Sequence, residues 1–188
     1  MNEWDGNARL AYAQHAASFV SVYPAAIDCA HLAVEALIDF SFGKYPIALS
    51  CYDEKSDAWV TAFSGDFNSK SAFSSAAIPD AHELWVKNTV EVKATELSPG
   101  DLIMTMRPNY SHGHTRIVHS VDASIDPSNP YVVCYQGNLP IKIPVRAEGY
   151  LADIVNRQDP FDPKGAKTLP RRWFFDHFNN EFRIRSLI

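Results

Sequence analysis

Residues 28–43 read Asp-Cys-Ala-His-Leu-Ala-Val-Glu-Ala-Leu-Ile-Asp-Phe-Ser-Phe-Gly, and this stretch decides the predicted fold. Asp28 is a good N-cap, and Gly43 is a typical residue at which a helix ends. The segment between them is apolar on nearly all sides. We therefore expect a helix at the centre of the molecule, with Cys29 in its first turn.

Cys29 is the candidate nucleophile, because it alone of the three cysteines lies at a predicted helix start. Unpaired backbone N–H groups and the positive end of the helix dipole favour thiolate over thiol there. Cys51 and Cys134 lie in apolar stretches and are expected to be core thiols. An odd, small number of cysteines predicts no disulfide framework and a reducing environment.

The candidate base is a histidine in Gly113-His114-Thr115-Arg116-Ile117-Val118, a segment that reads as the start of a strand. Strand alternation puts His114 and His119 on opposite faces, so they cannot share a site. We choose His114, because a close backbone approach at Gly113 leaves room for a ligand. His112 is the alternative base. A metal held by His112 and His114 lacks further ligands at suitable spacing, so we expect no metal or other cofactor.

A thiol and an imidazole need a third group that fixes the imidazole tautomer. Gln136 and Asn138 follow the next predicted strand, and either amide oxygen fits this role. Alternation does not choose between them, and Gln136-Gly137-Asn138 also reads as a plain polar turn. Tyr23 precedes Cys29 by six residues. It is a candidate for binding an oxyanion together with the Cys29 N–H, and the alternative is that it packs in the core as an aromatic residue.

The order of elements predicts an α+β fold, in which a central helix packs on an antiparallel sheet. Helices are expected over residues 7–22, 28–42 and 81–88, the first with Leu10, Ala13, Ala17 and Val20 on its buried face. Residues 64–80 are predicted to form a long loop, either a lid or a disordered stretch. Strands are expected over residues 45–52, 89–92, 102–104, 115–121 and 131–135, with possible edge strands over 141–145 and 182–188.

Length and composition predict one domain over residues 1–188. The chain has 46% hydrophobic and 21% charged residues, enough for one well-buried core. Its net charge of −5 argues against nucleic acid or an anionic membrane surface as a partner. The basic residues Arg171, Arg172, Arg183 and Arg185 are interpreted as the solvated face of a terminal helix and strand. An acidic N-terminus and the lack of a long apolar run predict neither a secretion signal nor a membrane anchor.

Three motifs in this order resemble the papain-like cysteine peptidase superfamily in its bacterial CHAP and NlpC-type forms. Asp28-Cys29-Ala30-His31-Leu32 is similar to the nucleophile helix, and Pro99-Gly100-Asp101-Leu102-Ile103 to a Pro-Gly-Asp-Leu strand. Gly113-His114-Thr115-Arg116-Ile117-Val118 is similar to the strand that carries the histidine. The longer string from Cys29 to Phe40 resembles toxin domains of type VI secretion effectors more closely still.

The resemblance implies a papain-like fold with Cys29 as nucleophile, His114 as base, and Gln136 or Asn138 as the orienting residue. Gln136 departs from the usual Asn, Asp, Glu or His. The implied function is an interbacterial toxin that cleaves a protein in the target cell. Such a toxin is cytoplasmic in its producer, delivered without a signal peptide, and paired with an immunity protein.

Three alternative functions remain open on the same scaffold. The first is a peptidoglycan amidase or endopeptidase that acts in the periplasm. The second is a non-catalytic binding module. The third is an amide transferase or deamidase, because an acyl-thiol intermediate can be resolved by an amine or formed from a Gln side chain.

Overall fold

The computed structural model describes residues 1–108, 113–137, 143–156 and 166–187. The fold is α+β with antiparallel sheets, as the order of elements predicts. The helices are α1 (Gly6–Val22), α2 (Cys29–Ser41), α3 (Lys70–Ala76), α4 (Ala81–Glu83), α5 (Leu151–Asn156) and α6 (Phe175–Arg185). The strands are β1 (Ala48–Asp53), β2 (Ala58–Phe63), β3 (Thr89–Glu91), β4 (Leu102–Met106), β5 (Gly113–Asp122), β6 (Tyr131–Gln136), β7 (Val145–Tyr150) and β8 (Lys167–Trp173). Short turns of helix, η1 (Ser64–Asp66), η2 (Leu84–Asn88) and η3 (Ala94–Glu96), connect them.

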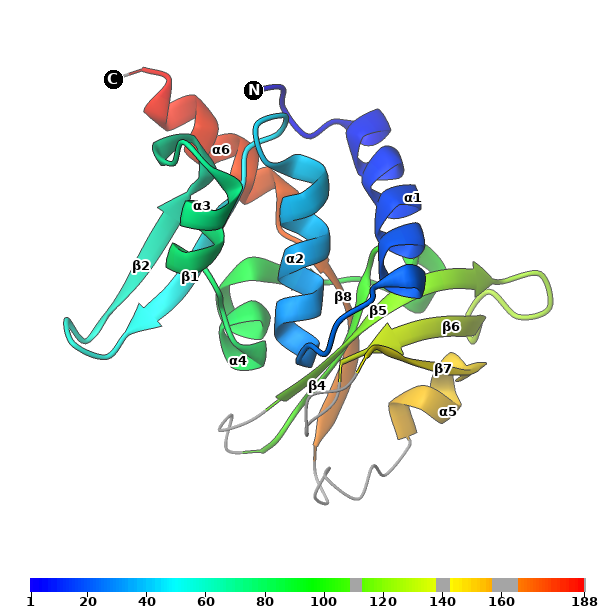
Figure 1. Cartoon of the computed structure of the whole chain (residues 1–188). Helices are drawn as coiled ribbons and strands as arrows, with labels where there is room; N and C mark the ends of the chain where they lie inside the picture. Colours follow the sequence, from blue (N-terminus) through cyan, green and yellow to red (C-terminus); the bar gives the residue numbers. More distant parts are fainter. Residues whose placement is uncertain (109–112, 138–142, 157–165, 188) are drawn as a thin grey trace.

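Helix α2 lies at the centre of the molecule, as its apolar sequence predicts. Leu32, Ala33, Ala36 and Leu37 are fully enclosed. Helices α1 and α2 lie side by side against the sheet, and α5 lies beside β7 (Figure 1). Most apolar residues of α2 belong to the main hydrophobic core, so the burial of this helix contributes much of the stability of the fold.

The main sheet has the strand order β3-β8-β4-β5-β6-β7 in the described part of the chain, and all neighbouring strands in it are antiparallel. Alternation divides β5 between two cores. Ile117 packs in the core that contains α2, whereas Val118 packs with Cys134 and α5. The two faces of β5 therefore have separate surroundings.

Helix α1 begins and ends close to where the sequence predicts, and its buried face agrees with the predicted one in part. Ala13 and Val20 are buried as predicted, whereas Leu10 is 60% exposed and the buried face also includes Tyr12 and Ala16. An alanine-rich helix has little contrast between its faces, so its rotation is set by what it packs against. The Tyr12 hydroxyl accepts a hydrogen bond from Trp173 Nε1 at 2.8 Å, and this bond fixes the rotation.

The loop predicted over residues 64–80 is wrong, because η1 and α3 occupy most of it. Ser69 caps α3 by accepting a hydrogen bond from the Ala72 N–H at 3.2 Å. Phe73 anchors the helix in the main core, with no exposed surface. The segment before it, for which the sequence predicts no helix or strand, holds β2, paired with β1 as a hairpin. Serine is common in loops but equally good as a helix cap, so composition misassigned the segment.

The predicted edge strand over residues 182–188 is also wrong, because this segment continues α6 as far as Arg185. Phe175, Phe178 and Phe182 follow a helical period and face the core. The second possible edge, over residues 141–145, lies partly outside the described residues, and β7 begins at Val145. Strand β8, which lies between β3 and β4, is not among the predicted strands either.

The basic residues of β8 are not a solvated face. Arg171 is buried, and its Nε donates to Thr89 Oγ1 at 2.7 Å. Arg172 binds both carboxylate oxygens of Asp101 at 2.7 Å. The side chains of Arg183 and Arg185 form exposed ion pairs with Glu3 and Asp66. The two arginines of β8 therefore bind this strand to η2 and β3 and to the turn before β4.

In the ranges the structure describes, no helix combines the length and apolar character needed to cross a membrane.

Candidate active site

The N-terminus of α2 presents Cys29 as the first helical residue. Asp28 caps the helix by accepting a hydrogen bond from the His31 N–H at 2.9 Å, and its other oxygen contacts His31 Nδ1. Asp28 and His31 are both partly exposed. The cap holds the first turn of α2 in place, so the Cys29 side chain has a defined direction.

The electrostatic surroundings of Cys29 act in two directions. Burial raises the pKa of the Cys29 thiol above its ordinary value. The backbone N–H groups of Thr115, Ala30 and Cys29 itself favour the thiolate by hydrogen bonding, and the charge of Arg116 adds to this. The net direction is upward, which differs from the expectation for an exposed helix start. Desolvation outweighs the helix terminus at this site.

The start of strand β5 lies near Cys29, because the Thr115 backbone N–H is one of the groups that lower the pKa of the thiol, and His114 directly precedes Thr115. Gly113 starts the strand where a side chain would not fit. A Cβ at this position would lie 2.8 Å from the Met106 side chain and 3.0 Å from the Thr105 carbonyl oxygen. The close approach expected at Gly113 is therefore packing of β5 on β4, and not space for a ligand.

His114 is hydrogen-bonded to Gln136 across the sheet. The His114 Nε2 lies 2.8 Å from Gln136 Oε1. An amide oxygen only accepts, so Nε2 carries the proton. In the neutral ring Nδ1 is then the basic nitrogen. Of the two orienting candidates, Gln136 makes this bond, while Asn138 lies outside the described residues.

Gly137 brings the end of β6 against the start of α2. A Cβ on Gly137 would lie 2.3 Å from the Ile27 carbonyl oxygen and 2.6 Å from the Asp28 backbone. This contact is backbone against backbone, so only glycine fits. It ties Gln136 to the residue before Cys29. The three elements that carry Cys29, His114 and Gln136 therefore meet at one place.

The other candidates occupy different surroundings. The Tyr23 hydroxyl donates to Glu35 Oε2 at 2.6 Å, and desolvation raises the pKa of Tyr23 to about 12. Glu35 lies six residues after Cys29, so this hydroxyl is engaged along α2 and does not support an oxyanion role. His119 packs on Tyr135, with ring centroids 5.6 Å apart. The alternative base His112 lies outside the described residues.

None of the three cysteines, all of which the structure describes, forms a disulfide. Cys134 is fully buried, as predicted for a core thiol. Cys51 is only partly buried, and desolvation raises its pKa to about 12. Within the described ranges, no three His, Cys, Asp or Glu side chains gather as metal ligands would.

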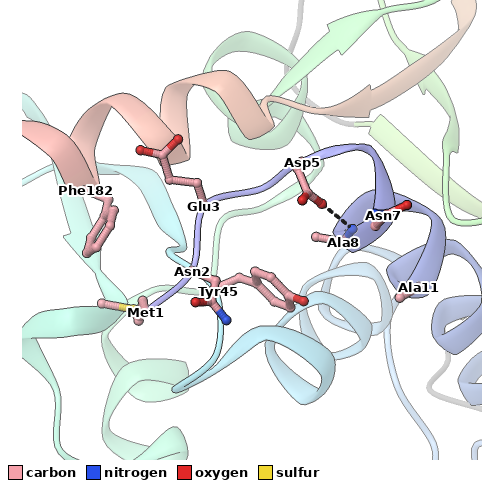
Figure 2. Close-up of a pocket in the computed structure, with 9 residues that line it drawn as sticks. All are labelled: Met1, Asn2, Glu3, Asp5, Asn7, Ala8, Ala11, Tyr45 and Phe182. Carbon is pink, nitrogen blue, oxygen red and sulfur yellow. Dashed lines mark hydrogen bonds between the residues drawn. The ribbon is translucent and has the colours of Figure 1, made fainter.

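Two hollows lie away from these residues. One, of about 820 Å³, surrounds the N-terminal segment and includes Tyr45 and Phe182 (Figure 2). The other, of about 470 Å³, runs along α1 past Gly100 and Asp101. Neither hollow includes Cys29 or His114. The Pro99-Gly100-Asp101 motif is thus tied to the Asp101–Arg172 ion pair and to the second hollow.

Sequence analysis missed Arg116 as a site residue. It lies two residues after His114 on β5 and is 5% exposed. The available signal was strand alternation, which places an arginine on the same face as His114. A fully buried arginine is uncommon, and its place directly before Ile117 and Val118 was the second signal.

Comparisons of the chain with protein-family models, with curated proteins and with solved structures found no significant match.

Proposed function

We propose that the protein is a papain-like cysteine peptidase that acts as an interbacterial toxin. The Cys29 thiolate attacks the carbonyl carbon of an amide and forms a tetrahedral intermediate. His114 gives its proton to the leaving amine, which produces a thioester on Cys29. Water then attacks the thioester, with His114 as base, and releases the acid and the thiol.

The observation that carries this proposal is the convergence of three distant segments. Gln136 of β6 binds the His114 ring of β5 at 2.8 Å, and the Thr115 backbone, next to His114, is one of the groups that favour the Cys29 thiolate. Gly137 packs on the Asp28 backbone at the start of α2. A nucleophile, a base and an orienting amide in this order are the components of thiol-dependent amide hydrolysis.

The raised thiol pKa explains why a base is required. Burial alone leaves Cys29 mostly protonated at neutral pH. A neutral His114 with its proton on Nε2 offers Nδ1 as the acceptor of the thiol proton. The first-turn N–H groups of Cys29 and Ala30, which favour the thiolate, are also suited to a developing oxyanion.

The biological setting of the proposal rests on the sequence resemblance. We propose a protein substrate in a competing bacterium, a cognate immunity protein in the producer, and delivery by a secretion apparatus. The net charge of −5 favours neither nucleic acid nor an anionic membrane as the target.

Expression of the unaltered chain and of Cys29→Ala in the cytoplasm and in the periplasm of a test bacterium checks this function. We expect growth arrest in the cytoplasm with the unaltered chain and none with Cys29→Ala, because the variant lacks the nucleophile. Cys51→Ser is the matched control and is expected to remain toxic, since its thiol pKa of about 12 makes it unreactive.

Incubation of the purified protein with cell lysate and with sacculi then identifies the reaction. Protein fragments from the lysate support the peptidase. Muropeptides without protein fragments would show a peptidoglycan amidase instead. Toxicity that survives Cys29→Ala would show a binding module, and mass shifts without cleavage would show a transferase or deamidase.

A further inference from the structure

Arg116 is a buried cation with few partners. Its side chain is 5% exposed, yet the described residues provide one hydrogen bond, from Nη1 to Thr105 Oγ1 at 3.3 Å. No carboxylate in the described ranges lies within ion-pair distance of it. A guanidinium has five N–H donors, so most of its binding capacity is unused by the described residues.

The other two arginines packed into the sheet contrast with Arg116. Arg171 donates to Thr89 Oγ1 and to the Trp85 and Thr89 carbonyls at 2.6–2.7 Å, and it lies over the Trp85 ring. Arg172 binds Asp101 with two bonds of 2.7 Å. Because an uncompensated buried charge is strongly destabilising, this chain satisfies its arginines elsewhere. Arg116 is the exception among these three.

The position of Arg116 connects it to the candidate active site. In the β4–β5 register, Arg116 lies opposite Ile103 and His114 lies opposite Thr105, so both arginine and histidine share one face of the sheet. The Thr105 hydroxyl that binds Arg116 is in turn hydrogen-bonded to Thr168 of β8 at 2.9 Å. The guanidinium is thus held among hydroxyl groups beside His114.

The charge of Arg116 also reaches the nucleophile. It lowers the pKa of Cys29, against the larger effect of burial. The geometry agrees, because His114, two residues before Arg116, binds Gln136, whose neighbour Gly137 packs on Asp28 beside Cys29. Thiolate stabilisation and anion binding are separate roles that an experiment distinguishes.

We propose that Arg116, with the Thr105 and Thr168 hydroxyls, forms a subsite for a carboxylate next to the scissile amide. The proposal rests on the proposed function and specifies its substrate class, an acidic peptide. The carboxylate belongs either to an Asp or Glu side chain or to a free chain terminus. A guanidinium is suited to both sources, because it matches the planar geometry of a carboxylate.

Alkylation of Cys29 by two reagents tests the subsite without a known substrate. Iodoacetate carries a carboxylate and iodoacetamide does not, while both add the same bond to sulfur. The measured quantity is the ratio of their rate constants, determined by mass spectrometry of the Cys29 peptide. We expect Arg116→Gln to lower this ratio about tenfold, the order expected for a lost charge-assisted hydrogen bond. Arg116→Lys is expected to retain part of it.

Arg146→Gln is the control, because it removes the same charge from an exposed ion pair on β7. Its ratio is expected to match the unaltered protein. If Arg116→Gln slows both reagents by the same factor, Arg116 acts on the thiolate alone and the subsite is refuted. If neither reagent labels Cys29 in the unaltered protein, the proposed function itself fails.

A second measurement uses the unaltered protein, so it does not require a variant to fold. It asks whether a small carboxylate protects Cys29 from labelling by iodoacetate. N-acetylglutamate α-amide supplies a side-chain carboxylate, N-acetylalanine a terminal one, and N-acetylglutamine amide neither. We expect one of the two acids to slow iodoacetate labelling and the neutral amide to have no effect. The protecting acid identifies the source of the carboxylate. Equal labelling with all three compounds would overturn the subsite.

Discussion

The residue that distinguishes this candidate site is Gln136, because the side chain that binds the His114 ring at Nε2 is an uncharged amide and not a carboxylate. The bond from Nε2 to Gln136 Oε1, at 2.8 Å, fixes the tautomer and the orientation of the ring. An amide carries no charge, so it stabilises an imidazolium less than a carboxylate does. The site therefore depends on geometry more than on charge at its third position.

We expect Gln136→Ala to shift the pH dependence of Cys29 alkylation upward by about one pKa unit, which is about tenfold in thiolate fraction at neutral pH. The released ring loses its fixed tautomer, so it accepts the thiol proton less well. The measurement is the iodoacetamide rate from about pH 5 to about pH 10. Gln136→Glu adds a charge and is expected to shift the profile downward.

Asn138→Ala is the comparison for this experiment, because both amides are possible orienting groups from sequence alone. Its profile is expected to match that of the unaltered protein. A shift with Asn138→Ala and none with Gln136→Ala would assign the orienting role to Asn138.

At the scale of elements, the start of α2 lies against the end of β6, close to the point at which β6 stops pairing with the start of β5. Gly137 permits the β6 backbone to meet Ile27 and Asp28, and Asp28 caps α2. The helix start and the two strand ends therefore form one unit. A change at this junction acts on all of its functional side chains together.

Gly137→Ala is expected to destabilise the fold by about 1–3 kcal/mol, because its Cβ would lie 2.3 Å from the Ile27 carbonyl oxygen. Displacement of β6 also moves Gln136, so Cys29 alkylation slows. Chemical denaturation measures the first effect and iodoacetamide labelling the second. Gly6→Ala is the control, since nothing lies within 4 Å of its added Cβ. Unchanged stability in Gly137→Ala would show that the junction is not closely packed.

The elements predicted from sequence were those with a strong period or clear caps. Helix α2 and strand β5 are where the sequence predicts them, because apolar residues and turn residues agree there. The segments predicted wrongly are α3 and the C-terminal part of α6. Phe73 and Phe182 stabilise these segments as helices by packing on the core. The core residues they contact are far away in the sequence, so a local pattern does not show the contact.

At the scale of the whole molecule, the C-terminal segment supplies a strand inside the main sheet, next to its edge strand β3. Strand β8 lies between β3 and β4, although it follows β7 in the chain. Trp173 at its end is 1% exposed and binds the Tyr12 hydroxyl of α1. The two ends of the chain are also joined, since Asn179 exchanges hydrogen bonds with the Trp4 backbone at 2.7 and 3.0 Å.

Trp173→Ala is expected to lower the free energy of unfolding by about 3–5 kcal/mol, because it leaves a large cavity between β8 and α1. Urea denaturation followed by circular dichroism measures this. Leu187→Ala, at a side chain 87% exposed, is the control and is expected to change stability by less than about 0.5 kcal/mol. A small effect at Trp173 would mean that β8 contributes little to the core.

The sequence by itself determined the α+β class, the central helix with its Asp28 cap, and the pairing of Cys29 with His114 as candidates. These features depend on local caps and periods, which neighbouring residues specify. The tertiary structure alone decided that Gln136 binds His114, that β8 lies between β3 and β4, and that Arg116 is buried with no carboxylate of the described residues at ion-pair distance. Each of these depends on strand register and burial, which join residues far apart in the chain.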